Sequence, residues 1–178
     1  RFYEGKKKLF QGLYIYDLDW DWPEHPIVYL DFNNIPAENR SVLEKSLQKR
    51  FKKIAADYEI ELEIENAYYM FPSLIEKLAA KYERGVVVLI DEYDKGIISN
   101  LASNDQQQLE IARENQKYLK ILYDNLKALM SELELVFITG ISKFSKLSIF
   151  STLNNLKELD MHPKFSHMLG YTEKELRD

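Results

Sequence analysis

The chain has 178 residues, of which 46% are hydrophobic and 30% are charged, and its formal net charge is −5. A chain of this size can bury a sizeable core, so we expect one soluble domain over residues 1–178. The absence of cysteine excludes disulfides, thiolate zinc sites and cysteine nucleophiles, and it fits a cytoplasmic location. The acidic balance argues against direct nucleic-acid binding, and no apolar run approaches the roughly 18 residues of a membrane span.

The first half of the chain predicts two strands separated by two helices. Residues 26–32 are rich in β-branched and aromatic types between turn signals, which indicates a strand. A capping box at 41–44 predicts a helix whose apolar residues recur with helical spacing. A second capping box opens a predicted helix over 73–84, and a glycine ends it. Residues 86–90, five apolar residues in succession, predict a buried strand.

The second half continues the alternation. A long helix is predicted to begin at Asn104 or Asp105, and a second buried strand is predicted over 133–138. A short helix over 145–152 and a strand over 156–159 are expected to follow. Strands that alternate with long helices imply βα units, so the predicted fold class is α/β with a mostly parallel sheet flanked by helices.

Polar residues follow directly after both predicted buried strands. Asp91 and Glu92 end the first strand, and Thr139 ends the second. Ligands of open α/β sheets bind at the carboxyl ends of the strands, where these side chains are expected to meet. An aspartate there can hold Mg²⁺ through its water shell, and the next carboxylate can orient or deprotonate water. This is a Walker-B-like pattern, although a core strand that simply ends on solvated acids would have the same sequence.

The motif that usually accompanies a Walker B strand is missing from these residues. A P-loop requires G-x-x-x-x-G-K-[ST], so that backbone N–H groups can surround the phosphates. The glycines stand at positions 5, 12, 85, 96, 140 and 170, and none of them forms that motif or the dinucleotide fingerprint G-x-G-x-x-G. The 178 residues are therefore not expected to bind ATP alone in the P-loop manner.

Several stretches, in order along the chain, resemble an AAA-ATPase-like domain of many bacterial proteins, which often precedes a PD-(D/E)XK nuclease-like domain. They are LFQGLYIYD (9–17), HPIVYLDF (25–32), VVVLIDEYDK (86–95), FITGISKFSKLSIFSTLNNLKEL (137–159) and HPKFSHMLGYTEKEL (162–176). The resemblance implies a P-loop-NTPase-like sheet whose N-terminal P-loop unit lies upstream of this chain. Residues 1–178 would then be a fragment that carries the Walker B and sensor parts.

The resemblance also implies roles for individual residues. Asp91 would be the Mg²⁺ residue, Glu92 the catalytic glutamate and Thr139 the sensor residue. Lys143 or Lys146 could offer a positive charge to a phosphate. ATP and Mg²⁺ are the implied cofactors, and a C-terminal effector domain, such as a nuclease-like one, is the implied partner. Gly96 departs from the family pattern, which commonly has proline after Asp-Lys.

Without a P-loop strand, the sheet is expected to have a gap between the neighbours of the Walker B strand. Exposed strand edges invite association, so self-association is a second expectation. The alternative to an ATPase domain is a non-catalytic protein-interaction module with a vestigial nucleotide site. An upstream segment that holds Gly-Lys-[Ser/Thr] after a strand would distinguish the two.

Two other kinds of site have weaker support. A PD-(D/E)XK nuclease needs an acid two residues before the lysine, and the residue two before Lys95 is Tyr93. His162 and His167 are five residues apart beside a turn-forming proline, with no cysteine in the chain. Such histidines are more often surface or packing residues than zinc ligands.

Overall fold

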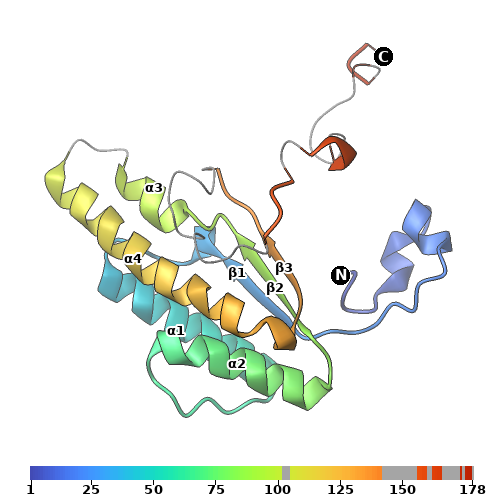
Figure 1. The fold of residues 1–178 in the computed structure, drawn as a ribbon, viewed down its shortest axis with the longest axis horizontal. Coiled ribbons are helices and arrows are strands. Elements are labelled where there is room, and N and C mark those ends of the chain that lie inside the picture. Colours follow the sequence, from blue (N-terminus) through green and yellow to red (C-terminus); the bar gives the residue numbers. More distant parts are fainter. Residues whose placement is uncertain (102–104, 142–155, 160–161, 166–172, 174, 178) are drawn as a thin grey trace.

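A computed structural model describes residues 1–101, 105–141, 156–159, 162–165, 173 and 175–177 (Figure 1). Its centre is a three-stranded sheet in the order β1-β2-β3, and both pairings are parallel. The strands are β1 (Ile27–Asp31), β2 (Val86–Asp91) and β3 (Leu133–Ile138). The predicted α/β class, its three principal strands and their parallel pairing are thus confirmed.

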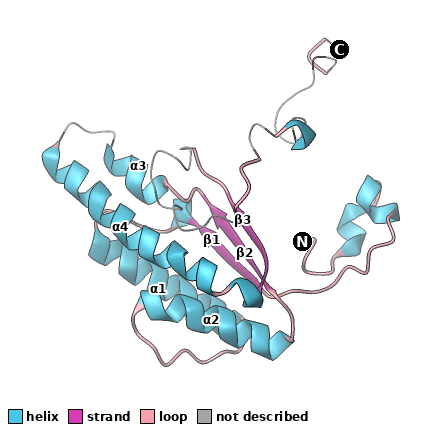
Figure 2. Cartoon of the chain, in the orientation of Figure 1, coloured by secondary structure: helices cyan, strands magenta, loops and turns pink. Residues whose placement is uncertain are grey.

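Helices lie between the strands along the chain and pack together (Figures 1 and 2). They are α1 (Arg40–Asp57), α2 (Ala67–Tyr82), α3 (Lys95–Leu101) and α4 (Gln106–Ala128). Within the described residues, short 3₁₀ helices occupy Lys7–Phe10, Tyr14–Asp17, Phe32–Asn34, Met130–Glu132 and Pro163–Phe165. None of the helices in the described part of the chain is long and apolar enough to cross a membrane.

The main core lies between one face of the sheet and the helices α1, α2 and α4. Because strand side chains alternate between faces, Val28 and Leu30 of β1 point into this core beside Val88 and Ile90 of β2. The opposite face carries Tyr29, which is 40% exposed. The same alternation places Asp31 and Asp91, the last residues of β1 and β2, on that second face, where both are half-buried.

Asparagine side chains cap the first two helices, and both helices begin earlier than predicted. The Asn39 side chain accepts a hydrogen bond from Val42 N, so α1 begins one residue before the predicted capping box. Asn66 caps α2, which therefore begins at Ala67, six residues before the predicted start. The third predicted cap is confirmed, since Asp105 accepts a bond from Gln107 N at the start of α4.

The start of α2 was predicted from the capping box at Ser73 and Glu76, but the helix begins ahead of it and includes Pro72. Proline inside a helix removes the N–H that would bond to the carbonyl four residues earlier. In the structure Pro72 lies within α2, and the Tyr68 carbonyl faces the side-chain amide of Asn125 on α4 at 3.5 Å. The Asn125 amide on α4 therefore partly replaces the hydrogen-bond donor that Pro72 lacks.

Three further expectations need correction, and a fourth is untested. The expected gap in the sheet was wrong, because β2 pairs directly with both neighbours. The strand β3 was expected to be buried, but it forms an edge of the described sheet and its Phe137 is 38% exposed. Residues 156–159 form no strand. The predicted helix over 145–152 lies outside the described residues.

Candidate functional site

The carboxyl ends of β2 and β3 bring Asp91 and Thr139 together. The strand ladder continues past both strands, because Thr139 N donates to Ile90 O at 2.9 Å and Tyr93 N donates to Thr139 O at 3.0 Å. The Thr139 hydroxyl donates a hydrogen bond to Asp91 Oδ1. The hydrogen bond holds the aspartate in one orientation. The two side chains meet at the carboxyl edge of the sheet, as expected for neighbouring parallel strands.

Glu92 lies next to this pair in an uncommon backbone conformation. Its φ is +54°, in the left-handed region that non-glycine residues rarely adopt. The bond from Lys95 N to Glu92 O, at 2.9 Å, closes the turn that follows. The carboxylate is half-buried and has no hydrogen bond or ion pair with the described part of the chain. Strained residues of this kind cluster at functional sites. Trp22, Glu59 and Glu83 have similar positive φ values outside the strand ends, so Glu92 stands out only because it also lies beside Asp91 at the sheet edge.

Buried groups behind the edge keep this turn in place. Tyr93 and Asp94 are both at most 1% exposed, and Asp94 Oδ1 accepts a bond from Ile141 N at 3.3 Å. Gly140 passes so close that a Cβ atom on it would lie 2.4 Å from the Tyr93 ring and 2.8 Å from Asp94 Oδ1. Only glycine fits there, and the end of β3 is therefore fixed against the turn after β2.

Asp31 is a site residue that the sequence analysis missed. It ends β1 and is the direct register partner of Asp91, so the two residues lie side by side at the same edge. Asp31 also accepts bonds from Asn33 N at 2.9 Å and Asn34 Nδ2 at 2.5 Å. The strand predicted over 26–32 contains Asp31, but which residue lies beside Asp31 in the sheet depends on strand order. The pairing of Asp31 with Asp91 could be predicted only if the strand order were known.

Tyr29 precedes Asp31 by two residues and shares its face of the sheet. Burial raises the pKa of Tyr29, and the nearby Asp31 and Asp91 carboxylates raise it further. The opposing contribution comes from Arg50, whose guanidinium donates to the Tyr29 carbonyl at 2.7 and 3.0 Å. The second face of the sheet thus combines acids and a protonated phenol at its carboxyl edge.

The donor set suits a cation that takes few protein ligands. Among the described residues, no group of three or more histidine, cysteine, aspartate or glutamate side chains could hold a metal. Asp91 and Asp31 offer carboxylate oxygens on adjacent strands, and Mg²⁺ commonly uses one or two carboxylates while it keeps several waters. The residues therefore fit Mg²⁺ better than a metal that needs a complete protein cage.

The remaining predicted candidates are two lysines and two histidines. Lys143, Lys146 and His167 lie outside the described residues. His162 is exposed, and its Nδ1 accepts a hydrogen bond from Lys164 N at 3.2 Å within a turn.

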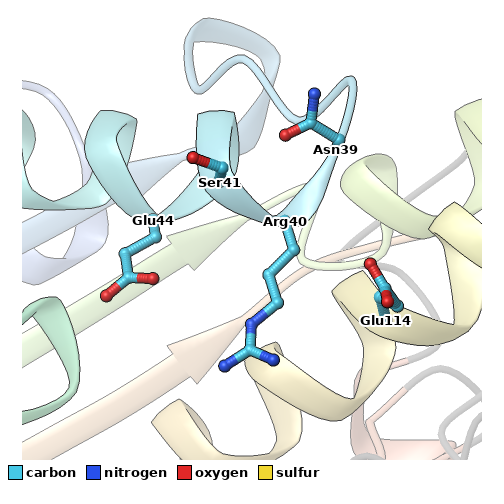
Figure 3. Close-up of a pocket in the computed structure, with 5 residues that line it drawn as sticks. All are labelled: Asn39, Arg40, Ser41, Glu44 and Glu114. Carbon is cyan, nitrogen blue, oxygen red and sulfur yellow. The ribbon is translucent and has the colours of Figure 1, made fainter.

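A shallow pocket of about 360 Å³ lies at the start of α1, apart from these residues (Figure 3). Its lining consists of Asn39, Arg40, Ser41, Glu44 and Glu114. The Arg40 guanidinium lies 5.6 Å from the centre of the Tyr118 ring on α4. No residue of the Asp91 edge lines this pocket, so it is a separate feature.

Comparisons with known proteins define the class of this domain. The family model described as predicted AAA-ATPase, AAA-ATPase-like, matches residues 1–150, and the chain belongs to this family. The chain is also 33% identical over 175 residues to an "Uncharacterized protein in vnfD 5'region" of Azotobacter chroococcum mcd 1. That match covers 98% of this chain and 33% of the relative, so the chain spans about a third of the relative's length. No solved structure matches it significantly.

Proposed function

We propose that this chain forms the magnesium- and water-binding part of an ATP-hydrolysing site in an AAA-like regulatory domain. The observation that carries the proposal is the meeting of Asp91, Glu92 and Thr139 at the carboxyl edge of a parallel sheet. Membership of the predicted AAA-ATPase family supports it. The compartment we propose is the cytoplasm, where ATP is available.

Each residue has a distinct part in the proposed reaction. Asp91 binds Mg²⁺, which would neutralise charge on the phosphates. Thr139 fixes the Asp91 carboxylate by its hydrogen bond and would sense the state of the nucleotide. Glu92 orients the attacking water and accepts its proton, a role that suits a carboxylate without partners in the described chain. Lys143 or Lys146 would supply a charge to the phosphates.

The phosphate-binding loop has to come from other residues, since the glycines of this chain form no P-loop. We propose that it lies upstream in the same polypeptide. The relative, about three times as long as this chain, has room for such a segment and for the implied C-terminal effector domain.

Glu92→Gln tests the proposed chemistry in a polypeptide that includes the upstream segment. The amide keeps the shape of the side chain but cannot accept a proton, so we expect ATP turnover to fall at least about 100-fold while Mg-ATP binding persists. Asp57→Asn, at the exposed end of α1, is the matched control and should change neither. Wild-type turnover in Glu92→Gln would overturn the assignment.

A further inference from the structure

A buried asparagine on α4 joins the loops that follow β1 and β2. Asn115 is 0% exposed, and its Nδ2 donates to Ala37 O at 2.8 Å and to Gly96 O at 2.9 Å. Ala37 lies between β1 and α1, and Gly96 lies in the first turn of α3, just after the Asp91–Glu92 pair. One amide group thus holds two segments that are about sixty residues apart in the sequence.

The contacts around Asn115 indicate that its role depends on the Nδ2 donor and not on the Oδ1 acceptor. The Nδ2 group of Asn100 points at the same two carbonyls at 3.4 and 3.3 Å. The Asn115 Oδ1 atom is buried and has no hydrogen-bond partner within the described chain, an arrangement that is costly in a protein interior. An apolar side chain would avoid that cost, so the value of asparagine at this position lies in its two donated bonds.

The two joined segments are in close contact and connect directly to the acids. A Cβ atom on Gly96 would lie 3.1 Å from the Ala37 side chain. The turn between Glu92 and Gly96 is closed by bonds from Lys95 N to Glu92 O and from Ile97 N to Asp94 O. Displacement of Gly96 would therefore be transmitted to Glu92 and to Asp91 beside it.

We propose that Asn115 is a positioning residue that locks the loop after β1 onto the turn after β2. It thereby sets the geometry of Asp91 and Glu92 relative to Asp31. The inference rests on the proposed function for its consequence in catalysis, but the lock itself depends only on the contacts of Asn115.

Asn115→Leu is the direct test, because leucine has a similar size and no donor. Amide hydrogen exchange should become at least tenfold faster at Tyr93 and Ile97, whose N–H groups bond at 3.0 Å to Thr139 O and Asp94 O. In a polypeptide that turns over ATP, the Mg²⁺ concentration for half-maximal rate should rise at least fivefold. Asn100→Ala removes the longer bonds and should produce a smaller change in the same direction, which covers the case that Asn115→Leu does not fold.

Asn125→Leu is the matched control on the same helix. It removes a donor to the Tyr68 carbonyl, far along α4 from the turn, and should lower stability without changing the Mg²⁺ requirement. Unchanged exchange at Tyr93 and Ile97, with a Mg²⁺ requirement within twofold of wild type, would overturn the proposal. The exchange measurement uses no ATP, so wild-type protein without turnover would contradict the proposed function alone.

Discussion

Glu92 combines a left-handed backbone with a position beside Asp91 at the end of β2. A glutamate with φ of +54° carries strain that glycine would not carry. The sequence predicted a functional role for this carboxylate, because an apolar strand that ends in Asp-Glu is typical of Walker B segments. It could not predict the strain, since that depends on how the ends of β2 and β3 bond to each other.

Glycine at position 92 should therefore separate stability from activity. We expect Glu92→Gly to be about 1 kcal/mol more stable than Glu92→Ala, because both lose the carboxylate but only glycine relieves the left-handed backbone. Both variants should lose ATP turnover in a polypeptide that contains the phosphate-binding loop. Urea denaturation measures the difference, and equal stabilities would show that the backbone at Glu92 is not strained.

Asp31 illustrates what sequence reasoning misses at this scale. Asp91 and Thr139 could be placed at one edge, because both end strands of a predicted parallel sheet. Asp31 lies within the strand predicted over 26–32, but only the order β1-β2-β3 makes it the partner of Asp91. Strand order follows from how whole elements pack, and no local pattern in the chain expresses it.

Helix α4 contributes two buried tyrosines to the core. Tyr118 is 7% exposed and Tyr123 is fully buried. Burial raises the pKa of both phenols, and the neighbouring Glu44 adds to the effect at Tyr118. Since their pKa values lie above the ordinary value near 10, the unfolded chain releases these protons first as the pH rises.

The stability of the fold should consequently decrease in alkali. The contribution of each tyrosine is complete below about pH 10 and is lost above it, by up to about 1.4 kcal/mol per pH unit for each group. Denaturation from pH 8 to 11.5 should show this decrease, and Tyr123→Phe should reduce its slope. An unchanged slope in that variant would mean that Tyr123 ionises as readily in the folded protein as in the unfolded chain.

The contact between α2 and α4 gives a second prediction at the scale of elements. Asn125→Leu should cost about 1 kcal/mol of stability, because it leaves the Tyr68 carbonyl without the donor that Pro72 cannot provide. In a Pro72→Ala background the new N–H can bond to that carbonyl, so the same change should cost less. A double-mutant cycle measures the difference, and equal costs in both backgrounds would contradict this coupling.

The predicted elements show where local patterns suffice and where they fail. The strands over 133–138 and 86–90 were found almost to the residue, because apolar runs of that length between turn signals have few alternatives. The predicted start of α2 was wrong, because the helix is capped by Asn66 and not by the capping box at Ser73 and Glu76. The exposure of β3 was also wrong, because burial of a strand depends on what covers its face and its outer edge.

For the whole molecule, the central claim is that Asp91 belongs to a nucleotide site completed by residues upstream. The continuous sheet β1-β2-β3 leaves the outer edge of β3 without a partner strand in the described chain. The outer edge of β1 also has no partner strand in the described residues, so the self-association that was expected from a gap rests on these two edges. It stays a prediction that light scattering can test.

The most direct measurement is a calorimetric titration of Mg-ATP into this chain extended upstream by about 30–50 residues, the length of one βα unit. We predict binding that Asp91→Ala weakens at least tenfold and that Asp57→Ala, the exposed control, leaves unchanged. The chain of 178 residues without the extension should not bind. Absence of binding by the extended protein, or equal binding by Asp91→Ala, would contradict the account and favour an interaction module with a vestigial site.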